Sequence, residues 1–171
     1  MVAGAAANVE VLCLDVDGVM TDGGIQLDDN GVETKRFHVR DGTGIWVWIK
    51  LGYQVALITG RSGNVVKHRA AELGIRHVVQ GSSDKAEALD GLLRELSLAP
   101  AQAAVLGDDL PDLAMMRPAG YAMAVADAAP EVRQAAAFVT TLAGGRGAVR
   151  EAIEHLLREK NRWEEAVGLF A

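Results

Sequence analysis

The sequence contains 171 residues, of which 50% are hydrophobic, and its formal net charge is -6. This length and apolar content predict a single domain over residues 1–171 and exclude a disordered chain. The negative charge argues against a nucleic-acid partner or a membrane surface, since both require a basic face. We expect no secretory signal in residues 1–8 and no membrane span. The single cysteine, Cys13, is expected in the core and fits a cytoplasmic protein.

The first predicted element is a strand over residues 11–14, an apolar run that ends at Asp15, Asp17 and Gly18. Such a run is typical of a buried strand in a parallel sheet. Open α/β sheets bind ligands just beyond the carboxyl ends of these strands. This segment alone leaves two interpretations at even odds: a functional site, or a solvated turn, because Asp and Gly both favour turns.

A β-hairpin is predicted next. Residues 24–27 and 32–38 flank the turn Asp-Asp-Asn-Gly at residues 28–31, and Asn-Gly is a strong hairpin signal. We expect this flap, residues 24–38, to project just after the two aspartates. A loop at residues 38–42 then leads into a helix.

Strands and helices alternate over the rest of the chain. The alternation predicts right-handed βαβ units and a doubly wound, Rossmann-like α/β domain with a mostly parallel sheet. Ser82 or Ser83 is expected to cap the helix that begins at residue 83. The predicted strands span residues 54–59, 77–79, 103–106 and 122–125, and the predicted helices span residues 64–73, 83–96 and 113–116 and begin again at Glu131.

Polar side chains follow several of these strands, and one lysine begins a helix nearby. Because the carboxyl ends of parallel strands share one edge of the sheet, these groups can converge. Five gathered carboxylates would repel one another, and a hard divalent cation such as Mg²⁺ removes that conflict. A lysine among them adds positive charge for an anion, so the set predicts a phosphoryl-transfer site. The residues are Asp15, Asp17, Thr59, Lys85, Asp108, Asp109 and Asp112.

In order and placement, residues 15–19, Thr59, Lys85 and residues 107–112 resemble the four motifs of the haloacid dehalogenase superfamily of phosphohydrolases. The resemblance implies that fold and assigns roles to individual residues. Asp15 is the expected nucleophile, and it forms an aspartyl-phosphate. Asp17 is the expected acid and base. Thr59 is expected to hydrogen-bond phosphoryl oxygens, and Lys85 to neutralise phosphate and keep Asp15 ionised.

The resemblance also implies a metal site. The side chains of Asp15 and Asp108 and the backbone carbonyl of Asp17 are the expected Mg²⁺ ligands. Asp109 and Asp112 are expected to be supporting residues that position Lys85 and the waters on the metal.

The spacing of the motifs leaves no room for a separate cap domain. The hairpin and one helix fill most of the interval from Asp15 to Thr59, and one helix and one strand fill that from Thr59 to Lys85. An uncapped site is open to water, so we expect a neighbouring subunit to cover it. This predicts a homo-oligomer in which the hairpins associate.

Four further segments narrow the resemblance to capless phosphatases that act on an acidic eight-carbon sugar 8-phosphate for lipopolysaccharide precursor synthesis. The segments are residues 21–23, 37–42, 58–61 and 143–151. The resemblance implies a homotetramer with a central barrel of hairpins. It also implies that C-terminal segments, here the tail at residues 160–171, lie at the active sites of neighbours.

A substrate that carries both a carboxylate and a phosphate favours an arginine-rich site. For Arg69, a solvated helix face is the alternative. The residues that the resemblance assigns to the substrate are Asp17, His38, Val39, Arg40, Asp41, Gly42, Arg61, Arg69, Lys85 and Arg146.

Two features depart from the family pattern, and three other functions stay open. Trp46 stands where arginine is common, and the tail is more aromatic than expected. One alternative is a phosphatase of a nine-carbon keto-acid sugar 9-phosphate, against which Arg61 argues. A second is a sugar-phosphate mutase, which an open site disfavours because a mutase must exclude water. A third is a non-catalytic oligomerisation module, which the retained carboxylates and Lys85 disfavour.

Overall fold

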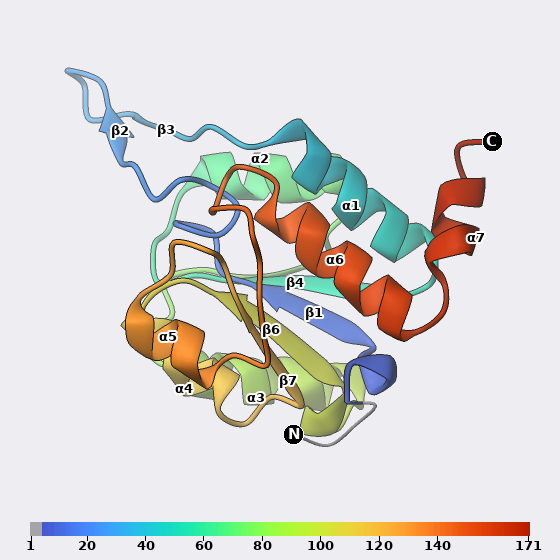
Figure 1. Cartoon of the computed structure of the whole chain (residues 1–171). Helices are drawn as coiled ribbons and strands as arrows, with labels where there is room; N and C mark the ends of the chain where they lie inside the picture. Colours follow the sequence, from blue (N-terminus) through green and yellow to red (C-terminus); the bar gives the residue numbers. More distant parts are fainter. Residues whose placement is uncertain (1–4) are drawn as a thin grey trace.

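A six-stranded parallel sheet forms the centre of the part of the chain that the structure describes, residues 5–171 (Figure 1). The structure is a computed structural model. Residues 1–4, which belong to the predicted domain and to the segment 1–8, lie outside the described residues. The strand order is β5-β4-β1-β6-β7-β8. The strands are β1 (Val11–Leu14), β4 (Gln54–Ile58), β5 (His77–Val79), β6 (Ala103–Gly107), β7 (Tyr121–Ala124) and β8 (Phe138–Val139).

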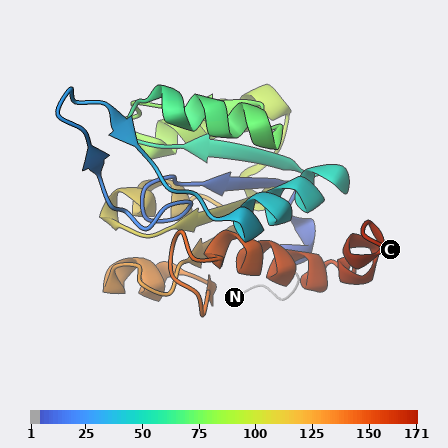
Figure 2. The same ribbon diagram turned by 90° about the horizontal axis from the view of Figure 1, so that it is seen from above.

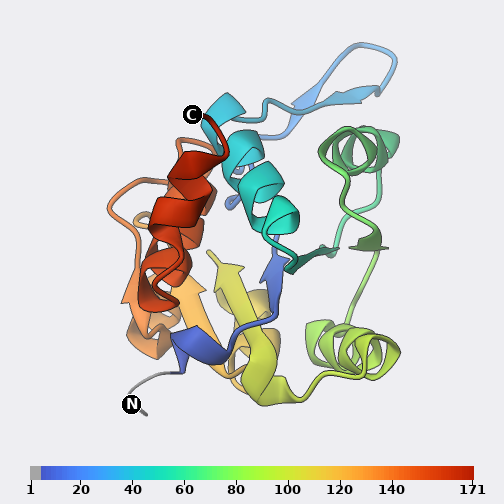
Figure 3. The same ribbon diagram turned by 90° about the vertical axis from the view of Figure 1, so that its right-hand side faces the viewer.

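Helices cover both faces of the sheet, which confirms the doubly wound α/β prediction (Figure 1). One face carries α1 (Val39–Lys50), α2 (Asn64–Leu73) and α6 (Ala148–Glu159), and α7 (Trp163–Gly168) packs on α6. The other face carries α3 (Lys85–Leu96), α4 (Leu113–Met116) and α5 (Pro130–Ala135). Figure 3 shows α2 and α3 on opposite sides of the edge strand β5. Short 3-10 turns lie at η1 (Ala6–Asn8), η2 (Pro100–Gln102) and η3 (Leu110–Asp112).

The register of the central strands places their carboxyl ends at one edge. Leu14 of β1 lies opposite Leu57 of β4 and Leu106 of β6. All residues of β1 are buried, as expected for a strand covered on both faces. Burial raises the pKa of the Cys13 thiol to about 12, so this cysteine is a core residue. No helix in residues 5–171 is long and apolar enough to cross a bilayer.

The flap is an antiparallel hairpin that extends beyond the carboxyl edge of the sheet (Figure 2). Its strands, β2 (Gln26–Leu27) and β3 (Glu33–Thr34), are shorter than the predicted segments 24–27 and 32–38. The carboxylate of Asp28 accepts hydrogen bonds from the backbone N–H groups of Asn30 and Val32, and this fixes the turn.

Two predicted boundaries are wrong. The helix expected from residue 83 begins at Lys85, and its N-cap is Asp84, whose side chain accepts hydrogen bonds from the N–H groups of Ala86 and Glu87. A carboxylate there also suits the helix dipole, so it displaces the two serines as the cap. The expected loop at residues 38–42 is instead the first turn of α1, with His38 at the N-cap position.

Candidate active site

The predicted carboxylates and Lys85 converge at the carboxyl edge of the sheet. They line one hollow of about 350 Å³, open to solvent, where the chain leaves β1, β4 and β6 and where α3 begins. This convergence follows from the parallel register. The lining residues are Asp15, Asp17, Gly23, Thr59, Gly60, Arg61, Lys85, Asp108, Asp109, Pro111 and Asp112.

Lys85 forms the electrostatic centre of this hollow. Its buried ammonium donates hydrogen bonds to Oδ1 of Asp15 at 2.8 Å and to Oδ1 of Asp112 at 2.6 Å. Burial disfavours the charged lysine, but the two carboxylates outweigh it and raise the pKa of Lys85. Burial and the charge of Asp112 raise the pKa of Asp15 to about 6 in spite of the lysine. The lysine therefore offsets only part of the negative charge.

Asp112 connects the lysine to the loop after β6. Its Oδ2 atom accepts hydrogen bonds from the backbone N–H groups of Asp108 at 2.9 Å and Asp109 at 3.3 Å. A side chain at Gly107 would lie 2.6 Å from Cβ of Asp112, so only glycine fits there. These contacts support the prediction that Asp112 positions Lys85. Asp109 lies at the rim, exposed to solvent.

The donor set fits a hard divalent cation. Carboxylate oxygens of Asp15, Asp108 and Asp112 lie within 4.8 Å of one another. Oδ1 of Asp108 is buried and has no hydrogen-bond partner among residues 5–171. Burial and the charges of Asp112 and Asp15 raise the pKa of Asp108 to about 8. Because Asp112 already uses both oxygens, the free ligand atoms belong to Asp15 and Asp108.

A close approach of two loops brings Asp108 to the loop after β1. Gly18 has a φ of +96°, and a Cβ there would lie 2.0 Å from Oδ2 of Asp108. Thr59, at the end of β4, is buried, and its hydroxyl accepts a hydrogen bond from the N–H of Arg61 at 3.3 Å. The same hydroxyl can donate its own proton to a ligand oxygen.

Asp17 has two contrasting oxygens. Oδ1 accepts a hydrogen bond from the ammonium of Lys35 in the flap. Oδ2 is buried without a hydrogen-bond partner in the described chain, and Nε of Arg61 lies 3.8 Å from it. Sequence reasoning missed Lys35 and its second partner, Glu33, because a lysine in a hairpin is usually solvated and no local pattern marks it as buried.

Asp41 has a hydrogen-bond partner within its own chain. Its buried carboxylate accepts a hydrogen bond at 2.8 Å from the N–H of Arg150, in the first turn of α6. Nδ1 of His38 lies 4.0 Å from the same carboxylate. Neither residue lines the hollow. Asp41 therefore joins the N-termini of α1 and α6, a role that could not be read from its local sequence.

The other residues assigned to the substrate lie outside the hollow of their own chain. Arg40 is exposed on the first turn of α1. Val39, Gly42 and Arg69 line a separate hollow between α1 and α2. Arg69 is largely buried there, paired with Glu72 at 2.9 Å, so the solvated helix face does not describe it.

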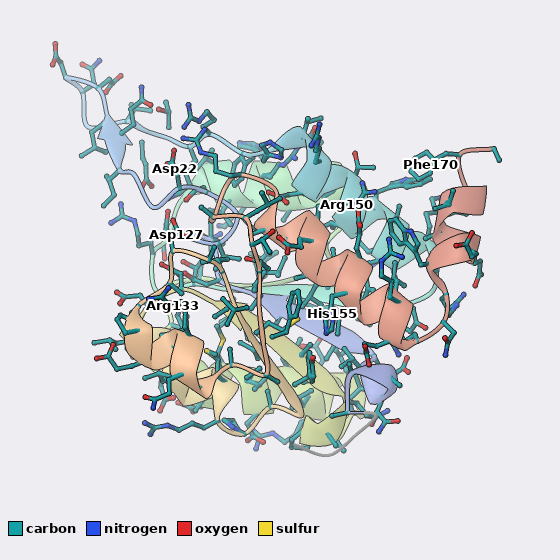
Figure 4. All side chains as sticks on the ribbon, viewed as in Figure 1. Asp22, Asp127, Arg133, Arg150, His155 and Phe170 are labelled. Atoms are coloured by element: carbon teal, nitrogen blue, oxygen red, sulfur yellow. The ribbon has the colours of Figure 1, made fainter. Side chains whose placement is uncertain are left out.

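Arg146 forms an ion pair with Asp22 at 3.3 Å and does not line the hollow. The glycines around it pack against the loop that follows β1. The N–H of Gly145 donates to the carbonyl of Val19 at 3.0 Å, and a Cβ on Gly144 would lie 1.7 Å from the carbonyl oxygen of Gly18. Figure 4 shows Asp22 near this crossing of the two loops.

The C-terminal tail packs on its own chain. The ring of Phe170 lies 5.6 Å from that of Trp46 on α1, and both border the hollow that contains Arg69. Within one chain this tail lies at the opposite end of the molecule from the flap (Figure 2). The tail therefore lies away from the hollow of its own chain.

Residues 72–153 match the family model of haloacid dehalogenase-like hydrolases. The chain is 47% identical over 163 residues to 3-deoxy-D-manno-octulosonate 8-phosphate phosphatase KdsC of Escherichia coli. These residues cover 95% of this chain and 87% of the relative. The chain belongs to this phosphatase family. Its Yersinia pestis member is 47% identical over 164 residues, which cover 96% of this chain and 88% of the relative.

Solved structures of the 3-deoxy-D-manno-octulosonate 8-phosphate phosphatase family share the fold. The Moraxella catarrhalis structure, in complex with magnesium ion, phosphate ion and the sugar, has a TM-score of 0.95 and 40% identity over 98% of this chain and 96% of that one. The cobalt-bound Haemophilus influenzae structure has a TM-score of 0.93 and 35% identity over 98% and 99% of the two chains. The predicted superfamily and the capless architecture are confirmed.

The position of Asp41 generates a test that separates a helix cap from a substrate contact. Asp41→Ala removes the acceptor for the N-terminus of α6, so the free energy of unfolding should fall by about 1–2 kcal/mol. KM should stay within about twofold of the wild-type value. Urea unfolding and steady-state kinetics measure the two effects. Asp41→Asn retains an acceptor and should keep most of the stability. A raised KM with unchanged stability would contradict the capping role.

Proposed function

We propose that this chain hydrolyses 3-deoxy-D-manno-octulosonate 8-phosphate to the free sugar acid and phosphate, with Mg²⁺ as cofactor. The observation that carries the proposal is the hollow in which Asp15, Asp17, Lys85 and Asp108 converge, on a chain 47% identical to phosphatases named for this substrate. A non-catalytic module has no need to keep a buried lysine between carboxylates, because such burial costs free energy.

The first step transfers the phosphoryl group to Asp15. A carboxylate oxygen of Asp15 attacks phosphorus, and the bond between phosphorus and the sugar oxygen breaks. Asp17 gives its proton to that oxygen, so the sugar leaves as an alcohol. Lys85 holds Oδ1 of Asp15 at 2.8 Å, which fixes the carboxylate toward the hollow. The product of this step is an aspartyl-phosphate.

The second step returns the enzyme to its starting state. Asp17, now a carboxylate, removes a proton from a water molecule, and the water oxygen attacks phosphorus. The bond between phosphorus and Asp15 breaks, phosphate leaves, and Asp17 is protonated again. The hydroxyl of Thr59 donates a hydrogen bond to a phosphoryl oxygen, and Lys85 offsets negative charge on the phosphoryl group.

The side chains of Asp15 and Asp108 and the backbone carbonyl of Asp17 would hold Mg²⁺. When bound, the ion supplies positive charge that these carboxylates and the phosphoryl oxygens share. The raised pKa of Asp108, about 8, supports this assignment, because the residues of the chain leave its negative charge unbalanced.

Arg61 is the side chain best placed to select the sugar acid. It lines the hollow and is 46% exposed, so its guanidinium can form paired hydrogen bonds with a carboxylate. Arg69, Arg146 and residues 38–42 lie outside this hollow and would meet a substrate only in the site of a neighbouring subunit. A substrate contact by these residues therefore depends on the oligomer.

Substitution of either catalytic aspartate tests the chemical mechanism. Asp15→Asn removes the nucleophile and Asp17→Asn removes the proton donor, so each should lower kcat by about 10³-fold or more. Phosphate release measures turnover, and far-UV circular dichroism checks that the fold persists. Full activity in either variant would refute the mechanism.

A panel of eight-carbon and nine-carbon keto-acid sugar phosphates tests the substrate. The wild type should show the highest kcat/KM with the eight-carbon 8-phosphate. Arg61→Glu should lower kcat/KM for this substrate by about tenfold or more, because the ion pair with the substrate carboxylate is lost. Trp46→Arg, measured alongside, reports whether the departure at this position changes selectivity. Equal or better turnover of nine-carbon substrates by the wild type would overturn the assignment.

We also propose a single domain over residues 1–171 that assembles as a cytoplasmic homotetramer through its flaps. The flap exposes three apolar side chains: Ile25 is 56% exposed, Leu27 59% and Val32 56%. Apolar groups exposed on a projecting hairpin favour association with another copy, which removes them from water. The buried thiol of Cys13 is compatible with a reducing compartment.

The assembly state can be tested at the flap. Leu27→Asp places a charge at the proposed interface, so light scattering after gel filtration should show a smaller species than the wild type. Gln26→Asp is the matched control, because the neighbouring residue in a strand points to the opposite face. A wild type that is monomeric, or a Leu27→Asp variant of unchanged mass, would contradict assembly through the flaps.

A further inference from the structure

Lys35 is a buried cation contributed by the flap. It follows β3, and its side chain is only 1% exposed. The ammonium donates hydrogen bonds to Oδ1 of Asp17 and, at 3.1 Å, to Oε1 of Glu33. An ammonium removed from water is costly unless it is paired, so these two carboxylates account for its position. Lys35 does not line the hollow, so it is not placed to contact a substrate there.

The contact makes the two oxygens of Asp17 unequal. Oδ1 is occupied by Lys35, whereas Oδ2 is buried and has no hydrogen-bond partner in residues 5–171. Asp17 lines the hollow that holds Asp15 and Lys85. A carboxyl group that is held by one oxygen can exchange a proton through the other. Oδ2 is therefore the atom free to carry the proton.

Glu33 fixes the lysine to the rest of the site. Its Oε1 atom accepts hydrogen bonds from Lys35 at 3.1 Å and from Nη2 of Arg61 at 2.8 Å. Arg61 follows β4, so the network joins the base of the flap to the loops after two strands of the central sheet. Because Glu33 is held by Arg61 as well, it restrains the ammonium of Lys35. Lys35 therefore loses little further side-chain entropy when it holds Asp17.

We propose that Lys35 is a positioning residue for Asp17. It holds the carboxyl group by Oδ1 and leaves Oδ2 directed at the leaving-group oxygen, and later at the attacking water. This inference rests on the proposed phosphatase function. Lys35 lies outside the four motifs that resemble those of the superfamily.

A comparison of two leaving groups tests the inference. A sugar oxygen needs a proton as it leaves, whereas 4-nitrophenolate leaves as an anion. Lys35→Met should lower the rate of phosphoryl transfer from the sugar 8-phosphate by about 10²-fold in single turnovers. The rate of the nitrophenolate burst from 4-nitrophenyl phosphate should stay within about threefold of the wild-type rate, because that step needs no acid. KM should change little, and Lys35→Arg should restore much of the rate.

Arg36→Met is the matched control, because Arg36 is the next residue, is exposed, and pairs with Asp22 outside the hollow. It should behave as the wild type with both substrates. Equal losses on both substrates in Lys35→Met would indicate a structural role, and a higher KM at unchanged kcat would indicate a substrate contact. Either result, or no loss, would overturn the inference. Lys35→Gln provides the same comparison if the Met variant does not fold.

A failure of the proposed substrate is distinguishable from a failure of this inference. If the wild type hydrolyses 4-nitrophenyl phosphate and glycerol 3-phosphate but not the sugar 8-phosphate, the substrate assignment is wrong. The leaving-group comparison then proceeds with glycerol 3-phosphate, whose alkoxide also needs a proton, and the same losses are expected in Lys35→Met.

Discussion

The buried ammonium of Lys85 is the interaction on which the site depends. It lies between Asp15 and Asp112, and Asp112 in turn holds the backbone of the loop after β6. Yet the pKa of Asp15 stays raised, to about 6, and that of Asp108 to about 8. One lysine is therefore too little positive charge for this cluster. A divalent cation would offset the remaining negative charge, and the site would then attract a phosphoryl group.

The catalytic cluster could be predicted because each member is encoded locally. An apolar run defines β1, the following polar residues define its end, and parallel register aligns Leu14 with Leu57 and Leu106. No long-range information is needed to bring such ends together. The start of α3 is a smaller case. A helix was evident from its apolar spacing, but the choice of Asp84 over two serines as the cap depends on charge near the helix dipole.

Asp41 and Lys35 have contacts that could not be predicted from their local sequence. Asp41 belongs to a segment that resembles a substrate loop, but its carboxylate holds the N-terminus of α6, which lies more than a hundred positions later. Lys35 shows the opposite outcome, a residue of ordinary surface type that is buried against Asp17. Neither role produces a periodic pattern in the sequence, because each depends on a contact with a residue elsewhere in the chain. A resemblance can thus mark a segment as important without revealing whether it binds ligand or holds the fold.

The flap combines two chemistries within one short hairpin. Its tip exposes the apolar side chains of Leu27 and Val32, whereas its base buries Lys35 against Asp17. A two-stranded ribbon is marginally stable by itself, so its geometry depends on what holds each end. Ion pairs hold the base, and association with other copies would hold the tip. If both operate, subunit assembly restrains the same segment that orients Asp17. A capless phosphatase would then gain an ordered proton donor from its quaternary structure, with no additional domain.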